Sequence, residues 1–184
     1  MRKRLFIAIN LPEKLKKYLD NLHFKWAGDQ SIRWVKPENI HLTLIFLGYL
    51  EINYLSQLIR AGQKSQEDII NQLSPLEIKL DEATLGPNFE HPRLIWVKIH
   101  PNPALEKMRN LIVNNLRKED IPFQEKHRRF IPHLTLARLN HAPRNFESEK
   151  ISWQFPVKSF ELMESRLQKS GAEYDILNRF TIAG

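Results

Sequence analysis

The feature that most constrains the fold is a set of segments that recurs in the same order in both halves of the chain. Arg4–Ile9 and Arg93–Ile99 are short strand-like runs, each followed by a proline and then by apolar residues at helical spacing. Ile78–Leu85 and Phe160–Leu167 alternate apolar and polar residues, which is typical of half-buried strands. Two copies are too few for a solenoid, so we expect two similar lobes that face each other.

Between these segments lies a third repeated element, the motif His-Leu-Thr-Leu, which begins at His41 and again at His133. On a strand, residues i and i+2 point to the same face. His41 and Thr43 therefore share one side while their leucines enter the core, and His133 and Thr135 do the same in the second copy. In two facing lobes, the two His-Thr pairs meet across a groove.

Two histidines and two threonines in a groove suit the cleavage of a phosphodiester by in-line displacement. That reaction needs a base on the attacking oxygen and an acid on the leaving oxygen, and imidazole serves in either state near neutral pH. Threonine hydroxyls donate to the non-bridging oxygens as negative charge develops. This chemistry requires neither a metal nor a cofactor.

Two other interpretations of the repeated motif stay open. A single His-x-Thr on a strand is commonly a partly buried polar pair, although packing alone does not explain why both residues recur at matched places. A mononuclear zinc site normally has three or four ligands, and no Asp, Glu or Cys accompanies the two histidines. We therefore predict no metal.

The composition indicates a basic globular protein without a disulfide framework. Apolar residues make up 42% and charged residues 27% of the 184 residues, and the formal net charge of +7 favours phosphate-bearing partners. There is no cysteine, which excludes disulfides and thiolate nucleophiles and fits a reducing cytoplasm. The apolar stretches are too short to span a membrane. We expect a cytoplasmic monomer that does not bind membranes.

Both motifs and their flanks resemble the two-histidine (2H) phosphoesterases, and more closely the RNA 2′,3′-cyclic phosphodiesterases once called 2′-5′ RNA ligases. The resemblance extends over most of the chain and includes Arg33-Trp-Val-Lys-Pro-Glu-Asn-Ile-His-Leu-Thr-Leu and Phe130-Ile-Pro-His-Leu-Thr-Leu-Ala-Arg. Phe46-Leu-Gly, Glu164-Ser and Gly171-Ala-Glu-Tyr belong to it as well.

The resemblance implies an α+β fold in which residues 1–184 form one bilobed domain, with antiparallel sheets lining a central cleft and helices outside. It implies hydrolysis of a terminal ribose 2′,3′-cyclic phosphate to a 2′-phosphate, with weak 2′-5′ RNA ligation. His41 would donate a proton to the leaving O3′, His133 would accept one from water, and Thr43 and Thr135 would hold the phosphate. The partners would be RNA ends, such as those of tRNA fragments, or small nucleotides.

Four further residues are candidate RNA contacts. Strict strand alternation places Arg138 on the face opposite His133, yet the resemblance favours it as a phosphate or RNA contact. Arg129 ends a basic cluster that begins at Lys126. Phe130 flanks the second motif and is a candidate to stack on a terminal base, with a place in the core as the alternative. Phe46 is expected to line the groove beside His41.

Each of the two alternating strands also carries a glutamate. Glu82 and Glu164 coincide when the two alternating strands are aligned. Their carboxylates are expected either near the cleft or as surface charges.

Two rival functions stay open. One is the same chemistry on a small cyclic nucleotide or a 2′-5′ oligonucleotide, and the other is a non-catalytic binder of RNA ends. Paired histidines argue against the binder, because arginine or lysine would hold phosphate better.

Overall fold

The structure is a computed structural model that describes residues 1–26, 32–73, 75–124, 130–143, 145–168 and 171–183. Its helices are α1 (Glu13–Asn21), α2 (Leu55–Leu73) and α3 (Pro103–Lys118), with short 3₁₀ turns at Leu22–Trp26, Pro37–Asn39 and Ile52–Tyr54. The strands are β1 (Arg2–Asn10), β2 (Ile32–Trp34), β3 (His41–Glu51), β4 (Glu77–Gly86), β5 (Leu94–Ile99), β6 (His133–Leu139), β7 (Glu149–Lys150), β8 (Gln154–Pro156), β9 (Ser159–Gln168) and β10 (Gly171–Thr181).

The strands of the described residues form one antiparallel sheet in the order β10-β9-β1-β3-β6-β5-β4-β7, with β2 beside β6 and β8 beside β4. The centre of this order is the contact between β3 and β6, where Leu42 and Leu134 are the paired residues. The order of strands is the same on either side of this seam, since β9, β1 and β3 are equivalent to β4, β5 and β6. The α+β class and the duplication are confirmed, although the two expected sheets are joined into one.

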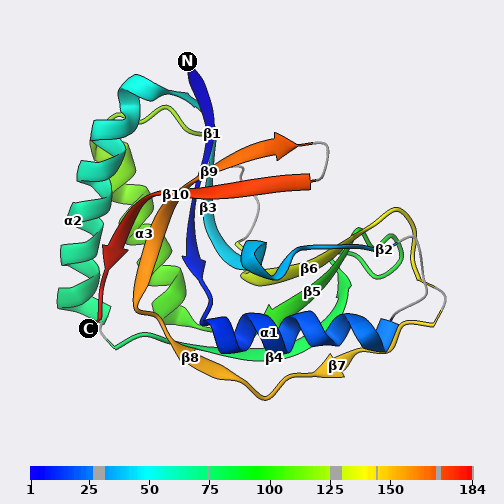
Figure 1. Ribbon diagram of the computed structural model, residues 1–184. Coiled ribbons are helices and arrows are strands. Elements are labelled where there is room, and N and C mark those ends of the chain that lie inside the picture. Colours follow the sequence, from blue (N-terminus) through cyan, green and yellow to red (C-terminus); the bar gives the residue numbers. More distant parts are fainter. Residues whose placement is uncertain (27–31, 74, 125–129, 144, 169–170, 184) are drawn as a thin grey trace.

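The first half of the chain gives its last strand, β4, to the other lobe, and the second half gives its last two, β9 and β10. Lobe 1 consists of β10, β9, β1 and β3, and therefore combines strands from both ends of the sequence. Lobe 2 consists of β6, β5, β4 and β7, so that β4 leaves the half to which β1 and β3 belong. In Figure 1, α2 and α3 lie together beside the strands of lobe 1, and α1 lies along the other end of the molecule.

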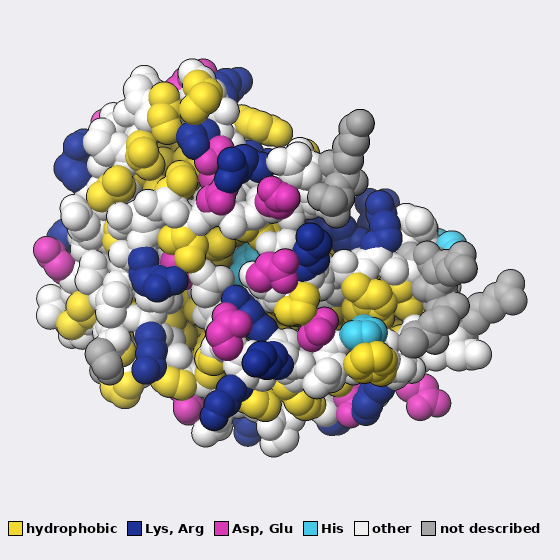
Figure 2. Space-filling view, in the orientation of Figure 1, with side chains coloured by type: hydrophobic (Ala, Val, Ile, Leu, Met, Phe, Trp, Pro, Cys, Tyr) yellow, Lys and Arg dark blue, Asp and Glu magenta, His cyan; other side chains and the backbone are white. Residues whose placement is uncertain are grey.

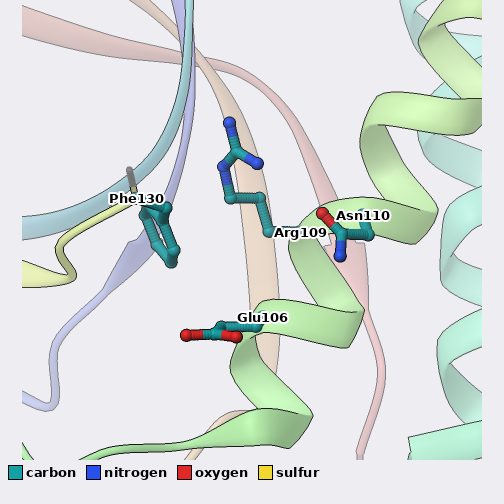
Figure 3. A pocket seen from close by; sticks show the side chains of 4 residues that line it. All are labelled: Glu106, Arg109, Asn110 and Phe130. Atoms are coloured by element: carbon teal, nitrogen blue, oxygen red, sulfur yellow. The ribbon is translucent and has the colours of Figure 1, made fainter. Parts of the chain in front are cut away.

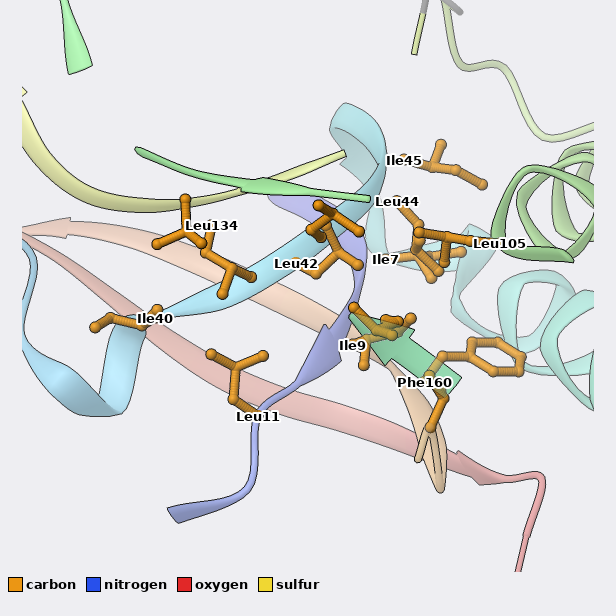
Figure 4. Close-up of a cluster of buried hydrophobic side chains, with 14 of the residues drawn as sticks. Ile7, Ile9, Leu11, Ile40, Leu42, Leu44, Ile45, Leu105, Leu134 and Phe160 are labelled. Carbon is orange, nitrogen blue, oxygen red and sulfur yellow. The ribbon is translucent and has the colours of Figure 1, made fainter. Parts of the chain in front are cut away.

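The main core lies between the sheet and the helices. In β1, Leu5, Ile7 and Ile9 point into it, and α3 contributes Leu105, whose amide nitrogen is 3.0 Å from the Asn102 side chain that caps the helix. Figure 4 shows Ile7, Ile9, Leu42, Leu44, Leu105 and Phe160 gathered in this layer. Phe6 and Ala8 leave β1 on the opposite face and form a second cluster with Met163.

Strand pairing also shows which residues of the two lobes are equivalent. Ala8 of β1 pairs with Thr43, and Trp96 of β5 pairs with Thr135, so Ala8 and Trp96 occupy the same place in their lobes. On the next strand outward, Ala8 pairs with Glu161. Trp96 pairs there with Thr84.

The equivalence of Glu161 and Thr84 shows that the predicted match of Glu82 with Glu164 is wrong. Glu82 accepts a hydrogen bond from Lys98 at 3.0 Å, whereas Glu164 pairs with Lys3 of β1. The alternating pattern repeats at every second residue and therefore does not fix the alignment. An irregularity between Leu80 and Ala83 of β4 shifts the register further.

Candidate active site

The four motif residues come together around the seam of the sheet. β3 and β6 are antiparallel and paired at Leu42 and Leu134. His41 therefore lies opposite Thr135, and Thr43 lies opposite His133. All four side chains are half-buried, and they leave the sheet on the face opposite the main core. This face is called the histidine face below.

Both imidazoles are oriented by the same backbone contact. Nδ1 of His41 is 2.7 Å from the carbonyl oxygen of Asn39, and Nδ1 of His133 is 2.8 Å from that of Ile131. A carbonyl oxygen only accepts, so Nδ1 carries the hydrogen in each ring and donates it. Nε2 is thereby left as the nitrogen that exchanges protons with a ligand. The sequence carried no signal for these two carbonyl groups.

The surroundings of His41 are aromatic and closely packed. Its ring centroid lies 5.0 Å from that of Phe6 and 5.0 Å from that of Tyr174, which stands edge-on at 88°. Nε2 lies 2.9 Å from Oγ1 of Thr43, so that the hydroxyl donates to the neutral imidazole. Asn39 also donates a hydrogen bond through Nδ2 to the carbonyl of Ala172 at 2.8 Å, which ties His41 to the β9–β10 hairpin.

His133 lies against the indole of Trp96. The indole of Trp96 is 4.7 Å from its ring centroid, and a Cβ added to Gly86 would lie 2.1 Å from Cε2 of that indole. Only glycine therefore leaves room for Trp96 at this place. Nε1 of Trp96 is buried and has no hydrogen-bond partner among the described residues.

Burial lowers the pKa of both histidines, since an apolar environment disfavours the charged imidazolium. The pKa of His41 falls to about 4, and the positive charges of His133, Lys16 and Arg138 add to the effect of burial. The pKa of His133 is lowered by burial alone, against the hydrogen bond to the Ile131 carbonyl. In the free protein at pH 7, both imidazoles are therefore mostly neutral.

Matched bulges bring two of the candidate RNA contacts onto the histidine face. Ile45 pairs with Ile7 and Thr43 with Ala8, so Leu44 is an extra residue in β3, and Leu136 is its counterpart in β6. Each bulge reverses the alternation of side chains along its strand. Phe46 and Arg138 are each five residues after a motif histidine, and the bulge places both on the histidine face. The prediction from strict alternation that Arg138 lies opposite His133 is wrong for this reason.

The other two candidate contacts lie elsewhere or cannot be placed. Phe130 is partly buried against the main core, with the guanidinium of Arg109 over its ring at 5.0 Å. Figure 3 shows these two residues in a pocket of about 210 Å³ beside α3, which Glu106 and Asn110 also line. Arg129 and the basic cluster from Lys126 lie outside the described residues.

Within the described part of the chain, no three His, Cys, Asp or Glu side chains are placed so that they could hold a metal ion. No helix in the same residues is long and apolar enough to cross a membrane.

Known proteins resemble this chain over nearly its whole length. A protein of Methanocaldococcus jannaschii named RNA 2′,3′-cyclic phosphodiesterase is 27% identical over 187 residues, which covers 96% of this chain and 99% of that protein. The crystal structure of TT0787 of Thermus thermophilus superposes with a TM-score of 0.85 at 25% identity and covers 98% of both chains. That of E. coli LigT complexed with 3′-AMP gives 0.82 at 23% identity and covers both chains fully.

The family model described as the AKAP7 2′5′ RNA ligase-like domain matches residues 6–175 and thus includes both His-Leu-Thr-Leu motifs. This match confirms the resemblance to the 2H phosphoesterases that the repeated motifs indicated. The chain belongs to the family of AKAP7 2′5′ RNA ligase-like domains.

Proposed function

We propose that the protein is an RNA 2′,3′-cyclic phosphodiesterase that converts a terminal ribose 2′,3′-cyclic phosphate to a 2′-phosphate. The observation that carries this proposal is the pair of His-Thr couples around the Leu42–Leu134 seam, each with Nδ1 fixed by a backbone carbonyl. Two Nε2 atoms on one face supply a proton acceptor and a proton donor for in-line displacement.

In the proposed reaction His133 takes a proton from water as the water oxygen bonds to phosphorus. The bond from phosphorus to O3′ breaks, and His41 gives its Nε2 proton to that oxygen. The products are a 3′-hydroxyl and a 2′-phosphate. Thr43 and Thr135 donate hydrogen bonds to the non-bridging oxygens, on which negative charge increases. Attack by an RNA 5′-hydroxyl in place of water would give weak 2′-5′ ligation.

The roles of the two histidines depend on the bound phosphate. A pKa of about 4 leaves His41 neutral in the free protein at pH 7. The negative charge of a cyclic phosphate raises the pKa of a nearby imidazole, which allows His41 to hold the proton that it donates. We therefore propose that the substrate binds before His41 takes up the proton that it donates.

We propose that Phe46 and Arg138 contact the nucleotide that bears the phosphate. They are equivalent residues of the two lobes on the histidine face, and both are exposed, Phe46 to 66%. An aromatic ring is a flat surface on which a nucleobase stacks without sequence preference, and a guanidinium matches phosphate oxygens. The terminal base is therefore proposed to stack on Phe46, while Arg138 contacts an RNA phosphate.

The proposal extends to the setting of the reaction. Both lobes of residues 1–184 act as one domain, since each contributes a histidine to the same face. The protein acts as a monomer on RNA ends, such as those of tRNA fragments, without a cofactor. A chain without cysteine fits the reducing cytoplasm.

The test is to incubate the protein, in the presence of EDTA, with a short RNA that ends in a 2′,3′-cyclic phosphate. The product is compared by mass and chromatography with synthetic 2′- and 3′-phosphate standards, and its sensitivity to phosphatase is measured. A 2′-phosphate product supports the proposal. A 3′-phosphate product, or activity that EDTA abolishes and zinc restores, contradicts it.

Two further results would favour the rival functions. Turnover of a cyclic mononucleotide but not of the RNA would indicate a small-nucleotide enzyme. RNA binding without turnover, equally strong in the double variant His41→Ala/His133→Ala, would indicate a binder of RNA ends.

A further inference from the structure

Two arginines stand directly opposite each other beside the four motif residues. Arg33 of β2 and Arg138 of β6 are paired in register, so their side chains leave the sheet on the same face. Both residues are exposed. Like charges directly opposite on neighbouring strands are destabilising, which makes the pair costly unless an anion lies between them.

Several other basic side chains of the sheet pair with carboxylates. Lys98 lies 3.0 Å from Glu82, Arg179 lies 3.1 Å from Glu161, and Lys3 pairs with Glu164. Basic and acidic side chains also interleave on the face seen in Figure 2. Among the residues that the structure describes, Arg33 and Arg138 have no such partner, so their two charges remain available to a ligand.

The position of the pair relates it to the proposed reaction. Arg138 is three residues beyond Thr135 on β6 and, because of the bulge at Leu136, on the face that carries the histidines. Its charge lowers the pKa of His41, which places it within electrostatic reach of the phosphate. Arg33 lies one strand further, on the edge of β6 that also receives β3.

The strand that carries Arg33 is firmly held, although it is short. The ring of Trp34 stacks on that of Trp26 with centroids 6.1 Å apart, and Ile32 is buried in the main core. The amide nitrogen of Val35 donates to the carbonyl of Leu136 at 2.8 Å. The guanidinium of Arg33 is therefore presented from a fixed backbone, and its exposed side chain can be replaced without loss of core packing.

We propose that Arg33, with Arg138, binds the phosphodiester that joins the terminal nucleotide to the rest of the RNA. The inference rests on the proposed function and specifies its substrate, since a cyclic mononucleotide has no such group. A guanidinium presents a planar fork of donors that matches two phosphate oxygens. Arg33 is thus a specificity residue that favours oligonucleotides.

The test compares two substrates, adenosine 2′,3′-cyclic phosphate and the dinucleotide ApA that ends in the same cyclic phosphate. The readout is the ratio of kcat/KM for the dinucleotide to kcat/KM for the mononucleotide. We expect Arg33→Gln to lower this ratio by about 10-fold or more, as for loss of a hydrogen bond to a charged group. Arg33→Lys should restore part of it, because lysine keeps the charge without the fork.

A matched control removes a positive charge elsewhere. Arg60 of α2 is exposed and pairs with Glu119 at 2.8 Å, and Arg60→Gln should leave the ratio unchanged. A third substrate carries a neutral methylphosphonate in place of the internal phosphate. The wild-type ratio should then fall to that of Arg33→Gln, and the variant should respond little to the change.

Three outcomes would overturn the inference. A ratio for Arg33→Gln within twofold of the wild type, or an equal fall for Arg60→Gln, would do so while the proposed function stands. A wild-type protein that hydrolyses neither cyclic phosphate would overturn the proposed function as well, and this result is distinct from the first two.

Discussion

The two His-Thr couples occupy equivalent strands, but the side chains around their imidazoles differ. His41 lies between Phe6 and Tyr174 and accepts a hydrogen bond from Thr43, whereas His133 has the indole of Trp96 beside it. Lobe 1 has Ala8 where lobe 2 has Trp96. The comparison shows how a duplicated motif gives two unlike titrating groups, since the neighbours and not the motif set the pKa of each histidine.

The largest effect is expected from removing either imidazole. His41→Ala and His133→Ala should each lower kcat/KM on an RNA that ends in a cyclic phosphate by about 10²–10⁴-fold, because each transfers one proton in the proposed reaction. The double variant should lose little more than either single variant. His100→Ala, an exposed histidine outside the motifs, is the control. Full activity without one motif histidine would show that the lobes do not act as a pair.

The pH dependence of titration and of activity tests whether the two histidines differ. Both pKa values lie below 6.5 in the free protein, so NMR titration from pH 8 downwards should show both histidines protonating below pH 6.5, with His41 protonating only near pH 4. The profile of kcat/KM should be bell-shaped with its maximum below pH 6.5, since one ring must be charged and the other neutral. A single shared midpoint would contradict the difference between the lobes.

The lowered pKa of His41 also affects stability. The unfolded chain binds a proton at this residue below about pH 6.5, and the folded protein does so only near pH 4. The contribution is therefore present above pH 6.5 and is lost as the pH falls towards 4, by up to about 3 kcal/mol. Urea unfolding of wild type and His41→Asn across this range measures it, and parallel curves would refute the assignment.

A smaller effect is expected at Gly86, which leaves room for Trp96. Gly86→Ala should lower the free energy of unfolding by about 1–3 kcal/mol, because its Cβ would overlap the indole. The cost should shrink in a Trp96→Ala background, where the overlap is absent. An equal cost in both backgrounds would mean that the backbone at residue 86, and not the contact, is responsible.

The smallest effect is expected from Trp96→Phe. Nε1 of Trp96 has no partner among the described residues, so its removal breaks no hydrogen bond. We expect the free energy of unfolding to change by less than about 1.5 kcal/mol, mainly through lost volume. A loss of several kcal/mol in urea unfolding would indicate that Nε1 is bonded, for example to an internal water molecule.

The sequence was informative where a local pattern repeats. The helical spacing recognised after Arg93–Ile99 is that of α3, and the paired motifs lie on adjacent strands. The bulges at Leu44 and Leu136 were not predictable from alternation, because they depend on how β1 and β5 pair with these strands. The contact between Tyr174 and His41 was likewise not predictable, because Tyr174 is distant in sequence and does not belong to a repeated motif.

The exchange of C-terminal strands between the two halves of the chain has a consequence for how the protein is made. During synthesis, β1 and β3 emerge early, but β9, the other neighbour of β1, begins only at Ser159. Until then one edge of β1 has no strand to pair with, and such edges invite aggregation. Pairing so distant in sequence is slow. His41 therefore gains its Tyr174 neighbour only when nearly the whole chain has left the ribosome, whereas the strands of lobe 2 can assemble before that.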